Sequence, residues 1–282
     1  FFTFSQSGSN ITVGDYGTNT GNEWNTSGRT HVIWTWDAGT STASNTDGSI
    51  TSSVRASQTN GFSIVSYTGN STSGATVGHG LNAKPEMIIL KSRTANESWF
   101  VNYPLGTGTG YLMLHDTAAA DTPNSTVWNS TAPTSSVFTL GNSSGVNGSQ
   151  NYIAYCFAPV EGYSAFGSYE GNGNADGPFV YTGMRPRWIL LKNADQGAGG
   201  YDWVLYDTER DTYNVAYQFL CPNANTKELR RGSDSVDKTD RYIDILSNGF
   251  RIRNSNANYN GNGDTHVWAA FAEHPFKTAR AR

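Results

Sequence analysis

The sequence predicts an all-β protein made of tandem antiparallel β-sandwich repeats of jelly-roll type, with the first repeat incomplete at its N-terminal end. Aromatic residues make up 13% of the chain and charged residues only 15%, against roughly 25% charged in an average soluble domain. Short apolar or alternating runs are separated by Gly, Asn, Ser and Pro, a pattern typical of strands joined by tight turns. The third observation is an internal repeat.

The repeat is visible as ordered matches between the two halves of the chain. Residues 85–91 (PEMIILK) match residues 186–192 (PRWILLK) at an offset of 101, and residues 152–159 (YIAYCFAP) match residues 266–273 (HVWAAFAE) at an offset of 114. Three further matches lie between these two in the same order. The offset grows only between the matched runs, where insertions into loops cost little. The sequence therefore predicts one strand-built unit copied along the chain.

Six strands are expected in the first complete unit, at residues 62–67, 87–91, 99–103, 111–115, 137–140 and 152–158. The run MIILK is apolar at successive positions, which favours a central strand covered on both faces. A repeat of 101 to 114 residues suits a two-sheet sandwich. A propeller would repeat every 40 to 50 residues or so.

The repeat also predicts the domain organisation. FFTF at the start and THVIWTWDAG at residues 30–39 resemble the closing strands of the later units. Because an isolated hairpin is marginally stable in water, we expect residues upstream of this chain, or a neighbouring chain, to complete that unit. The predicted parts are residues 1–38 as the C-terminal half of a truncated repeat, 39–60 as a polar linker with one short strand near its middle, 61–163 as the first complete repeat and 164–282 as the second.

Charge and hydropathy exclude several classes of function. The net charge is −4 and no basic cluster is present, so nucleic acid is not predicted as a partner. No apolar run approaches the roughly 18 residues of a membrane-spanning helix, and FFTFSQSGSN does not resemble a signal peptide. Cys156 lies inside an apolar run and Cys221 follows one, which predicts two buried thiols rather than a disulfide.

No motif predicts catalysis or metal binding. The five histidines are scattered, and no HExxH, paired-cysteine or GxSxG pattern occurs. Asp207, Glu209 and Asp211 alternate and could supply the two facing acids of a glycan hydrolase, but a solvated strand edge is the simpler interpretation. We therefore predict no enzymatic activity and no cofactor. The Asn- and Asp-rich loops 171–176 and 254–264 offer oxygens that calcium favours, although tight hairpins need the same residue types.

Aromatic residues in polar loops are the candidate ligand-binding residues. Trp24 and Trp128 lie in the stretches NEWNTS and TVWNST, and Tyr259 lies at an expected hairpin tip. Sugar rings stack on such side chains through their apolar faces. The alternative is that each aromatic side chain tucks under its own loop.

Several stretches resemble a family of tail-fibre-like or virion structural proteins of marine and aquatic tailed phages. They are SNTDGSI, GFSIVSYTGN, TVGHGL, APTSSVFTLG, LSNGFRIRNS and the long run YIAYCFAPVEGYSAFGSYEGNGNADGPFVYTG, and the resemblance covers nearly everything from Asn45 to Phe276. It implies a structural role on the virion surface, after assembly in the host cytoplasm, and it brings no catalytic residues.

From this resemblance we expect a tail fibre or appendage that contributes to host attachment through exposed loops. Its expected partners are other virion proteins, further copies of itself in a homo-oligomer or filament, and a host-surface glycan or protein. Two alternatives stay open at this point. One is a capsid decoration or filament-forming protein without receptor binding, and the other is a polysaccharide depolymerase.

Overall fold

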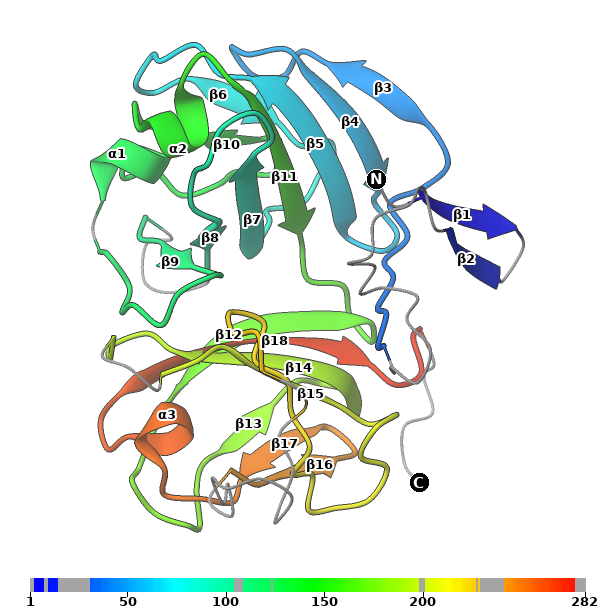
Figure 1. Ribbon diagram of the computed structural model, residues 1–282, viewed down its shortest axis with the longest axis vertical. Helices are drawn as coiled ribbons and strands as arrows, with labels where there is room; N and C mark the ends of the chain where they lie inside the picture. The colour runs from blue at the N-terminus through cyan, green and yellow to red at the C-terminus, as the bar shows by residue number, and fades with distance from the viewer. Residues whose placement is uncertain are drawn as a thin grey trace. The chain divides into compact units, whose positions relative to one another are not determined.

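The computed structural model (Figure 1) describes residues 3–7, 10–14, 31–103, 109–122, 124–197, 201–226, 228 and 241–276. The chain divides into two compact units, Phe1–Trp36 and Asp37–Arg282. Nearly all the regular structure in the described residues is antiparallel β-sheet, with three helices of four residues each. The predicted all-β class is confirmed.

The first unit contains a β-hairpin. Strands β1 (Thr3–Ser7) and β2 (Asn10–Gly14) pair antiparallel. The prediction of a closing strand at residues 30–39 is wrong as far as the structure describes this segment, because residues 31–39 contain no strand. Its alternating residues suit a strand, but a strand also needs a neighbour along its edge. In the described part of the chain no strand runs along this segment, and Val32 and Ile33 remain 42% and 49% exposed.

Residues 39–60 form two strands, so the predicted linker is wrong. Strand β3 (Thr42–Asn45) pairs with β4 (Ser52–Ser57), and β4 pairs with β5 (Phe62–Thr68). In β4, Ser52 and Val54 are buried while Ser53 is exposed. Successive residues of β4 thus alternate between a covered and a solvated face, as in any strand. Because small polar residues occur on both faces, the alternation is not visible as a pattern of apolar and polar residues in the sequence.

The first sandwich has a large sheet and a small second layer. In the described residues the large sheet has seven strands in the order β3-β4-β5-β11-β7-β8-β9, and β6 and β10 form the second layer. Strand β11 pairs along its length with both β5 and β7. The remaining elements are β6 (Thr76–Gly78), β7 (Met87–Ser92), β8 (Phe100–Asn102), β9 (Leu112–Met113), α1 (Ser125–Trp128), β10 (Val137–Thr139), α2 (Ser144–Asn147) and β11 (Asn151–Phe157).

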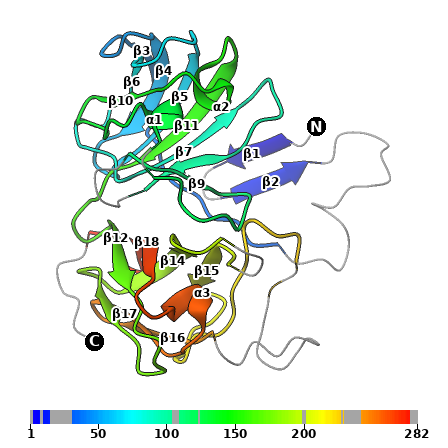
Figure 2. The ribbon, with the colours of Figure 1, turned by 90° about the vertical axis from the view of Figure 1, so that its left-hand side faces the viewer.

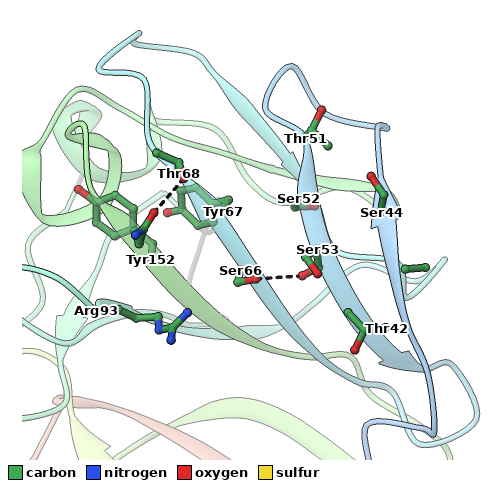
Figure 3. Close-up of a pocket in the computed structure, with 12 residues that line it drawn as sticks. Thr42, Ser44, Thr51, Ser52, Ser53, Ser66, Tyr67, Thr68, Arg93 and Tyr152 are labelled. Carbon is green, nitrogen blue, oxygen red and sulfur yellow. Dashed lines mark hydrogen bonds between the residues drawn. The ribbon is translucent and has the colours of Figure 1, made fainter.

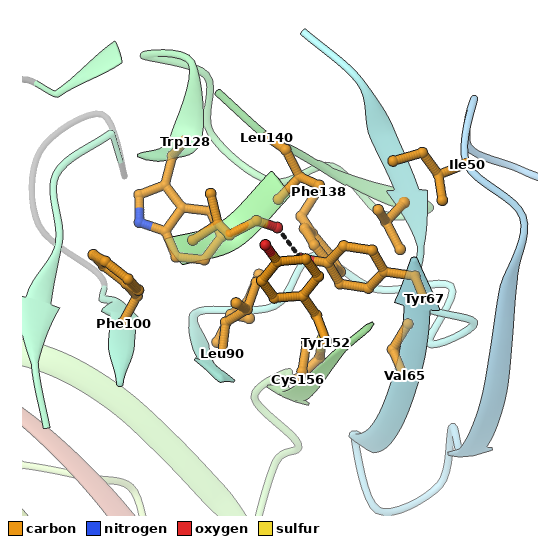
Figure 4. Packing of buried hydrophobic residues seen from close by; sticks show 14 of the residues in the cluster. Ile50, Val65, Tyr67, Leu90, Phe100, Trp128, Phe138, Leu140, Tyr152 and Cys156 are labelled. Carbon is orange, nitrogen blue, oxygen red and sulfur yellow. Dashed lines mark hydrogen bonds between the residues drawn. The ribbon is translucent and has the colours of Figure 1, made fainter. Parts of the chain in front are cut away.

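Aromatic side chains fill the space between these layers (Figure 4). Tyr67 stacks on Tyr152 with 5.2 Å between ring centroids, and Trp128 meets Phe138 edge-on. The Tyr67 hydroxyl donates to the Val146 carbonyl oxygen at 2.6 Å, which satisfies the one polar atom that this ring brings into the core.

The second sandwich has two sheets, with orders β12-β18-β14-β15 and β13-β17-β16 in the part of the chain that is described. Figure 2 shows β14 and β15 in one layer and β16 and β17 in the other. Its elements are β12 (Ser164–Glu170), β13 (Phe179–Tyr181), β14 (Pro186–Asn193), β15 (Val204–Asp207), β16 (Ile243–Leu246), β17 (Gly249–Ile252), α3 (Ala257–Asn260) and β18 (Thr265–Ala272).

The two sandwiches share their strand order. The order β5-β11-β7-β8 in the first corresponds to β12-β18-β14-β15 in the second, and the pair β6–β10 corresponds to β13–β17. The matched runs PEMIILK and PRWILLK contribute β7 and β14. This sequence match therefore falls on strands that occupy the same place in their sheets.

A buried asparagine ends the last short helix of each sandwich. Asn147 is fully buried, accepts the Asn70 N–H at 3.0 Å and donates at 2.8 Å to the carbonyl oxygens of Thr72 and Gly141. Asn260 is buried in the same way and makes the equivalent contacts, with the Asn172 N–H and with the carbonyl oxygens of Asn174 and Asn254. In each sandwich one amide side chain thus joins two loop segments to the end of a helix.

Hydrogen bonds join the two sandwiches within the second compact unit. The Trp203 indole N–H donates to the Met113 carbonyl oxygen at 2.9 Å, and the Ala120 N–H donates to the Ala194 carbonyl oxygen at 2.7 Å. Lys192 is 1% exposed. Its Nζ donates to carbonyl oxygens of both sandwiches, at 3.1 Å to Thr117 and 2.6 Å to Asn193.

Burial lowers the pKa of Lys192 from its ordinary 10.5 to about 8, against the opposing effect of nearby Asp202 and Asp116. Between these two values the unfolded chain keeps the proton that the folded protein has released. The free energy of unfolding should therefore rise with pH across this window.

Comparison with Lys192→Met tests this pH dependence. The difference in unfolding free energy, wild type minus K192M, is expected to rise by about 2 kcal/mol between pH 7.5 and 10. Urea denaturation at several pH values measures the unfolding free energy of both proteins. Tyrosines that titrate in the same pH range contribute equally to both, so their contribution cancels in the difference. A difference that stays constant with pH would show that Lys192 does not titrate in this range.

Candidate functional site

Two of the three candidate loop aromatics lie in the cores. Trp128 is 1% exposed and Tyr259 is fully buried, with its hydroxyl 3.1 Å from Nη1 of Arg241. The expectation that these rings are available to a ligand is wrong, because their polar neighbours cap short helices instead of lining a surface. The Asn124 side chain, for example, accepts two backbone N–H groups at the start of α1. Trp24 lies outside the described residues.

The alternating carboxylates do not form a facing pair. Asp207 binds Arg210, with 2.6 Å between Oδ2 and Nε, and Glu209 pairs with Arg187. Asp211 accepts two backbone N–H groups. Asp207 and Asp211 are buried rather than solvated. Each acid has its own structural partner, so the geometry gives no support to a hydrolase centre here.

Polar groups that could bind a metal are engaged in local structure. The described residues contain no group of three or more His, Cys, Asp or Glu side chains that could hold a metal ion. In the loop 171–176, the side-chain oxygens of Asn172 and Asn174 accept backbone N–H groups two residues on. Cys156 and Cys221 are buried and form no disulfide, as the sequence predicts.

His79 has a defined structural role. It is fully buried in the first sandwich. Its Nδ1 accepts the Leu81 N–H at 3.3 Å, and its Nε2 lies 3.2 Å from the Thr134 carbonyl oxygen. Burial lowers its pKa. A neutral ring with the proton on Nε2 satisfies both contacts.

A polar groove of about 530 Å³ crosses the outer face of the large sheet of the first sandwich (Figure 3). We call it the hydroxyl groove, because side chains bearing hydroxyl groups from β3, β4 and β5 and from the turn before β4 line most of it. Arg93 lies at its other side in Figure 3, and Asn151 also lines it. The serine and threonine residues of the groove include Thr42, Ser44, Thr51, Ser53, Ser66 and Thr68.

Strand register aligns these hydroxyls. Ser44 lies opposite Ser53, and Ser53 lies opposite Ser66, so three serines form a row across three strands. Thr68 lies opposite Asn151, and its Oγ1 donates to the Asn151 Oδ1 at 2.9 Å. Because side chains one strand apart on the same face lie about 5 Å apart, the row presents closely spaced donors and acceptors.

The groove has positive charge without a matching carboxylate. Arg93 is exposed, and its side chain makes no hydrogen bond or ion pair with any described residue. None of the groove-lining residues is acidic. A planar guanidinium beside rows of hydroxyls suits an oxygen-rich ligand that carries carboxylate or sulfate groups.

A family model described as a domain of unknown function, DUF7483, matches residues 2–275. The chain belongs to the DUF7483 family. Comparison with curated proteins and with solved structures found no match. Among the described residues, none of the helices of this DUF7483 chain has the length and apolar character needed to cross a membrane.

Besides Phe276, which is 49% exposed, three aromatic side chains in the described part of the DUF7483 chain are exposed on the second sandwich, where sequence reasoning missed them. Phe179 is 46% exposed, Tyr181 is 67% exposed and Tyr213 is 83% exposed. The run FVY at residues 179–181 follows a Gly/Asn-rich turn. Its two-residue period could have indicated that Phe179 and Tyr181 share one face. Only the pairing of β13 shows that this face points outward.

Proposed function

We propose that this DUF7483 protein is a structural protein of a phage virion surface, a tail fibre or related appendage, and that it contributes to attachment to the host. The resemblance of its long central motif to virion structural proteins supports the virion role. The hydroxyl groove is the observation that carries the attachment role. It offers a host-surface glycan many hydrogen-bonding groups and the guanidinium of Arg93, which has no ion-pair partner among the described residues.

The ligand class follows from the chemistry of the groove. Serine and threonine hydroxyls both donate and accept hydrogen bonds, as the hydroxyls of a saccharide do. Arg93 adds a site where a carboxylate or sulfate can bind in bidentate fashion. Each such site binds weakly, and many copies on one particle raise the effective affinity through avidity. An acidic polysaccharide of the host surface is therefore the proposed ligand.

The virion role is tested on purified particles. Mass spectrometry should detect this chain in the particles, and antibodies against it should label an appendage in electron micrographs. Labelling of the capsid lattice would favour the decoration alternative over attachment. Absence of the chain from purified particles would contradict the proposal.

The attachment role is tested by Arg93→Ala. We expect binding to an acidic polysaccharide, with alginate as the probe, to weaken about tenfold, because a hydrogen-bonded charge contact contributes roughly 1.5–3 kcal/mol. Arg187→Ala is the control for net charge, since Arg187 is a half-exposed arginine of the second sandwich and its removal changes the charge of the chain by the same amount. Affinity electrophoresis measures both variants. Equal weakening by the two variants would indicate a general charge effect and contradict a site at the groove.

A further inference from the structure

We propose that Phe179 and Tyr181 form an aromatic platform that binds the rings of a neutral saccharide. The platform lies on the small sheet of the second sandwich, whereas the hydroxyl groove lies on the large sheet of the first. It is therefore a second binding site with a different ligand preference. The inference goes beyond the proposed attachment through the groove and does not require that attachment to hold.

Strand geometry places both rings on one outward face. In the pairing of β13 with β17, Phe179 lies opposite Arg251 and Tyr181 lies opposite Gly249. Val180 between them is 4% exposed and points into the core. Two rings separated by two residues along a strand lie roughly 7 Å apart, close enough to contact adjacent units of one saccharide chain.

A glycine leaves room for the Phe179 ring against the backbone. A β-carbon on Gly249 would lie 3.1 Å from two ring atoms of Phe179, closer than most β-carbon contacts. The Tyr181 ring lies beside the turn at Gly183, where a β-carbon would be at the ordinary contact distances of 3.6 Å from the hydroxyl oxygen and 3.8 Å from ring carbons. The two rings thus lie close to backbone and keep other surface open to solvent. Rings held in this way lose little conformational freedom when a ligand binds.

The polar groups around the platform are balanced in charge. Arg251, beside Phe179, binds Asp176 with 2.7 Å between Nη2 and Oδ1. Arg253 lies near Asp244, with 3.4 Å between Nε and Oδ2. These paired groups can exchange hydrogen bonds with saccharide hydroxyls but present no excess charge. Apolar ring faces with flanking polar groups suit a neutral sugar. The groove differs, because Arg93 there has no carboxylate partner within the described parts of the chain.

The first sandwich covers the equivalent surface with its own chain. By strand order, Thr76 and Gly78 of β6 take the places of Phe179 and Tyr181. The Ser49 N–H donates to Thr76 Oγ1 at 2.9 Å, and the Asn45 side chain fills the space beside Gly78. In the second sandwich large aromatic rings replace these small residues and stay exposed. The platform is thus a feature of one sandwich only.

Affinity electrophoresis of the whole chain tests the platform. The probes are two neutral polysaccharides, a galactomannan and a dextran, and the acidic alginate. We expect the wild type to be retarded by at least one neutral probe. Phe179→Ala and Tyr181→Ala should each weaken that binding about tenfold or more and leave retardation by alginate unchanged. Tyr213→Ala is the matched control, because Tyr213 is an exposed tyrosine whose neighbour Asn214 is bonded to β16, at the opposite edge of the sheet from β13.

The outcomes separate the two sites. Unchanged binding of neutral probes by the double variant F179A/Y181A, or no retardation of the wild type by either neutral probe, would overturn the platform. Loss of self-association in the double variant, measured by sedimentation velocity, without a change in saccharide binding would assign these rings to an interface between copies and also overturn it. Failure of alginate binding alone would contradict the groove and leave the platform standing. Because both rings are exposed, thermal melting should show that the variants fold normally.

Discussion

Replacement of Asn260 by alanine is expected to lower the free energy of unfolding by about 3 kcal/mol, since an unpaired buried polar group costs roughly 1–3 kcal/mol. The Asn260 side chain is fully buried and satisfies the Asn172 N–H and the carbonyl oxygens of Asn174 and Asn254. Alanine removes the partner of all three groups at once. Water that enters from the exposed side of the loop can replace part of this loss, which is why the expected value is below the sum of three full penalties.

Urea denaturation of wild type, Asn260→Ala and Asn262→Ala measures this effect. Asn262 is exposed two residues further along the same loop, so its replacement should change stability by less than about 0.5 kcal/mol. Asn147→Ala should match Asn260→Ala, because Asn147 makes the equivalent contacts in the first sandwich. Equal unfolding free energies for Asn260→Ala and Asn262→Ala would show that the hydrogen bonds of the buried amide do not stabilise the fold.

Replacement of Trp203 by alanine is expected to cost about 4 kcal/mol, the range found when a large aromatic side chain is deleted from a core. Trp203 is 2% exposed and its indole N–H is bonded to the Met113 carbonyl oxygen. Together with Val101 and Tyr103 of the first sandwich, and Leu190 of its own, it lines a small apolar gap. Truncation would enlarge this gap and leave the carbonyl without its donor.

Differential scanning calorimetry should show a second consequence of Trp203→Ala. Without the indole ring to join them, the two sandwiches are expected to unfold in two transitions instead of one. Trp203→Phe keeps most of the packing and removes only the hydrogen bond, so its cost should be about 1–2 kcal/mol and its unfolding should stay a single transition. One transition at the wild-type temperature in Trp203→Ala would mean that Trp203 does not couple the sandwiches.

The strands of the first complete repeat could be predicted closely. The expected runs 62–67 and 87–91 became β5 and β7, and the run 152–158 became β11 with a shift of one residue. These predictions rest on a two-residue period and on flanking turn residues, both of which act over a few neighbouring positions. Residues 39–60 were expected to hold one short strand in a linker and instead hold β3 and β4, because serine and threonine on a solvated sheet face resemble the composition of a linker.

The candidate site depended on information that local pattern does not contain. Trp128 and Phe179 both lie near polar, turn-rich sequence, yet one is 1% exposed and the other 46%. The difference arises because the Trp128 ring packs against Phe138 of another strand, whereas the outward face of β13 is left uncovered.

The sequence by itself determined the all-β class, most strand positions and the two buried thiols, because alternation and turn chemistry are properties of adjacent residues. Only the tertiary structure decided which strands share a sheet, and therefore which faces are covered. The row of serines in the hydroxyl groove exists because β3, β4 and β5 lie in register. The exposure of Phe179 and Tyr181 likewise depends on packing between segments far apart in the chain. A side chain stays exposed only where no other segment packs over it, and the residues next to it in sequence do not decide that.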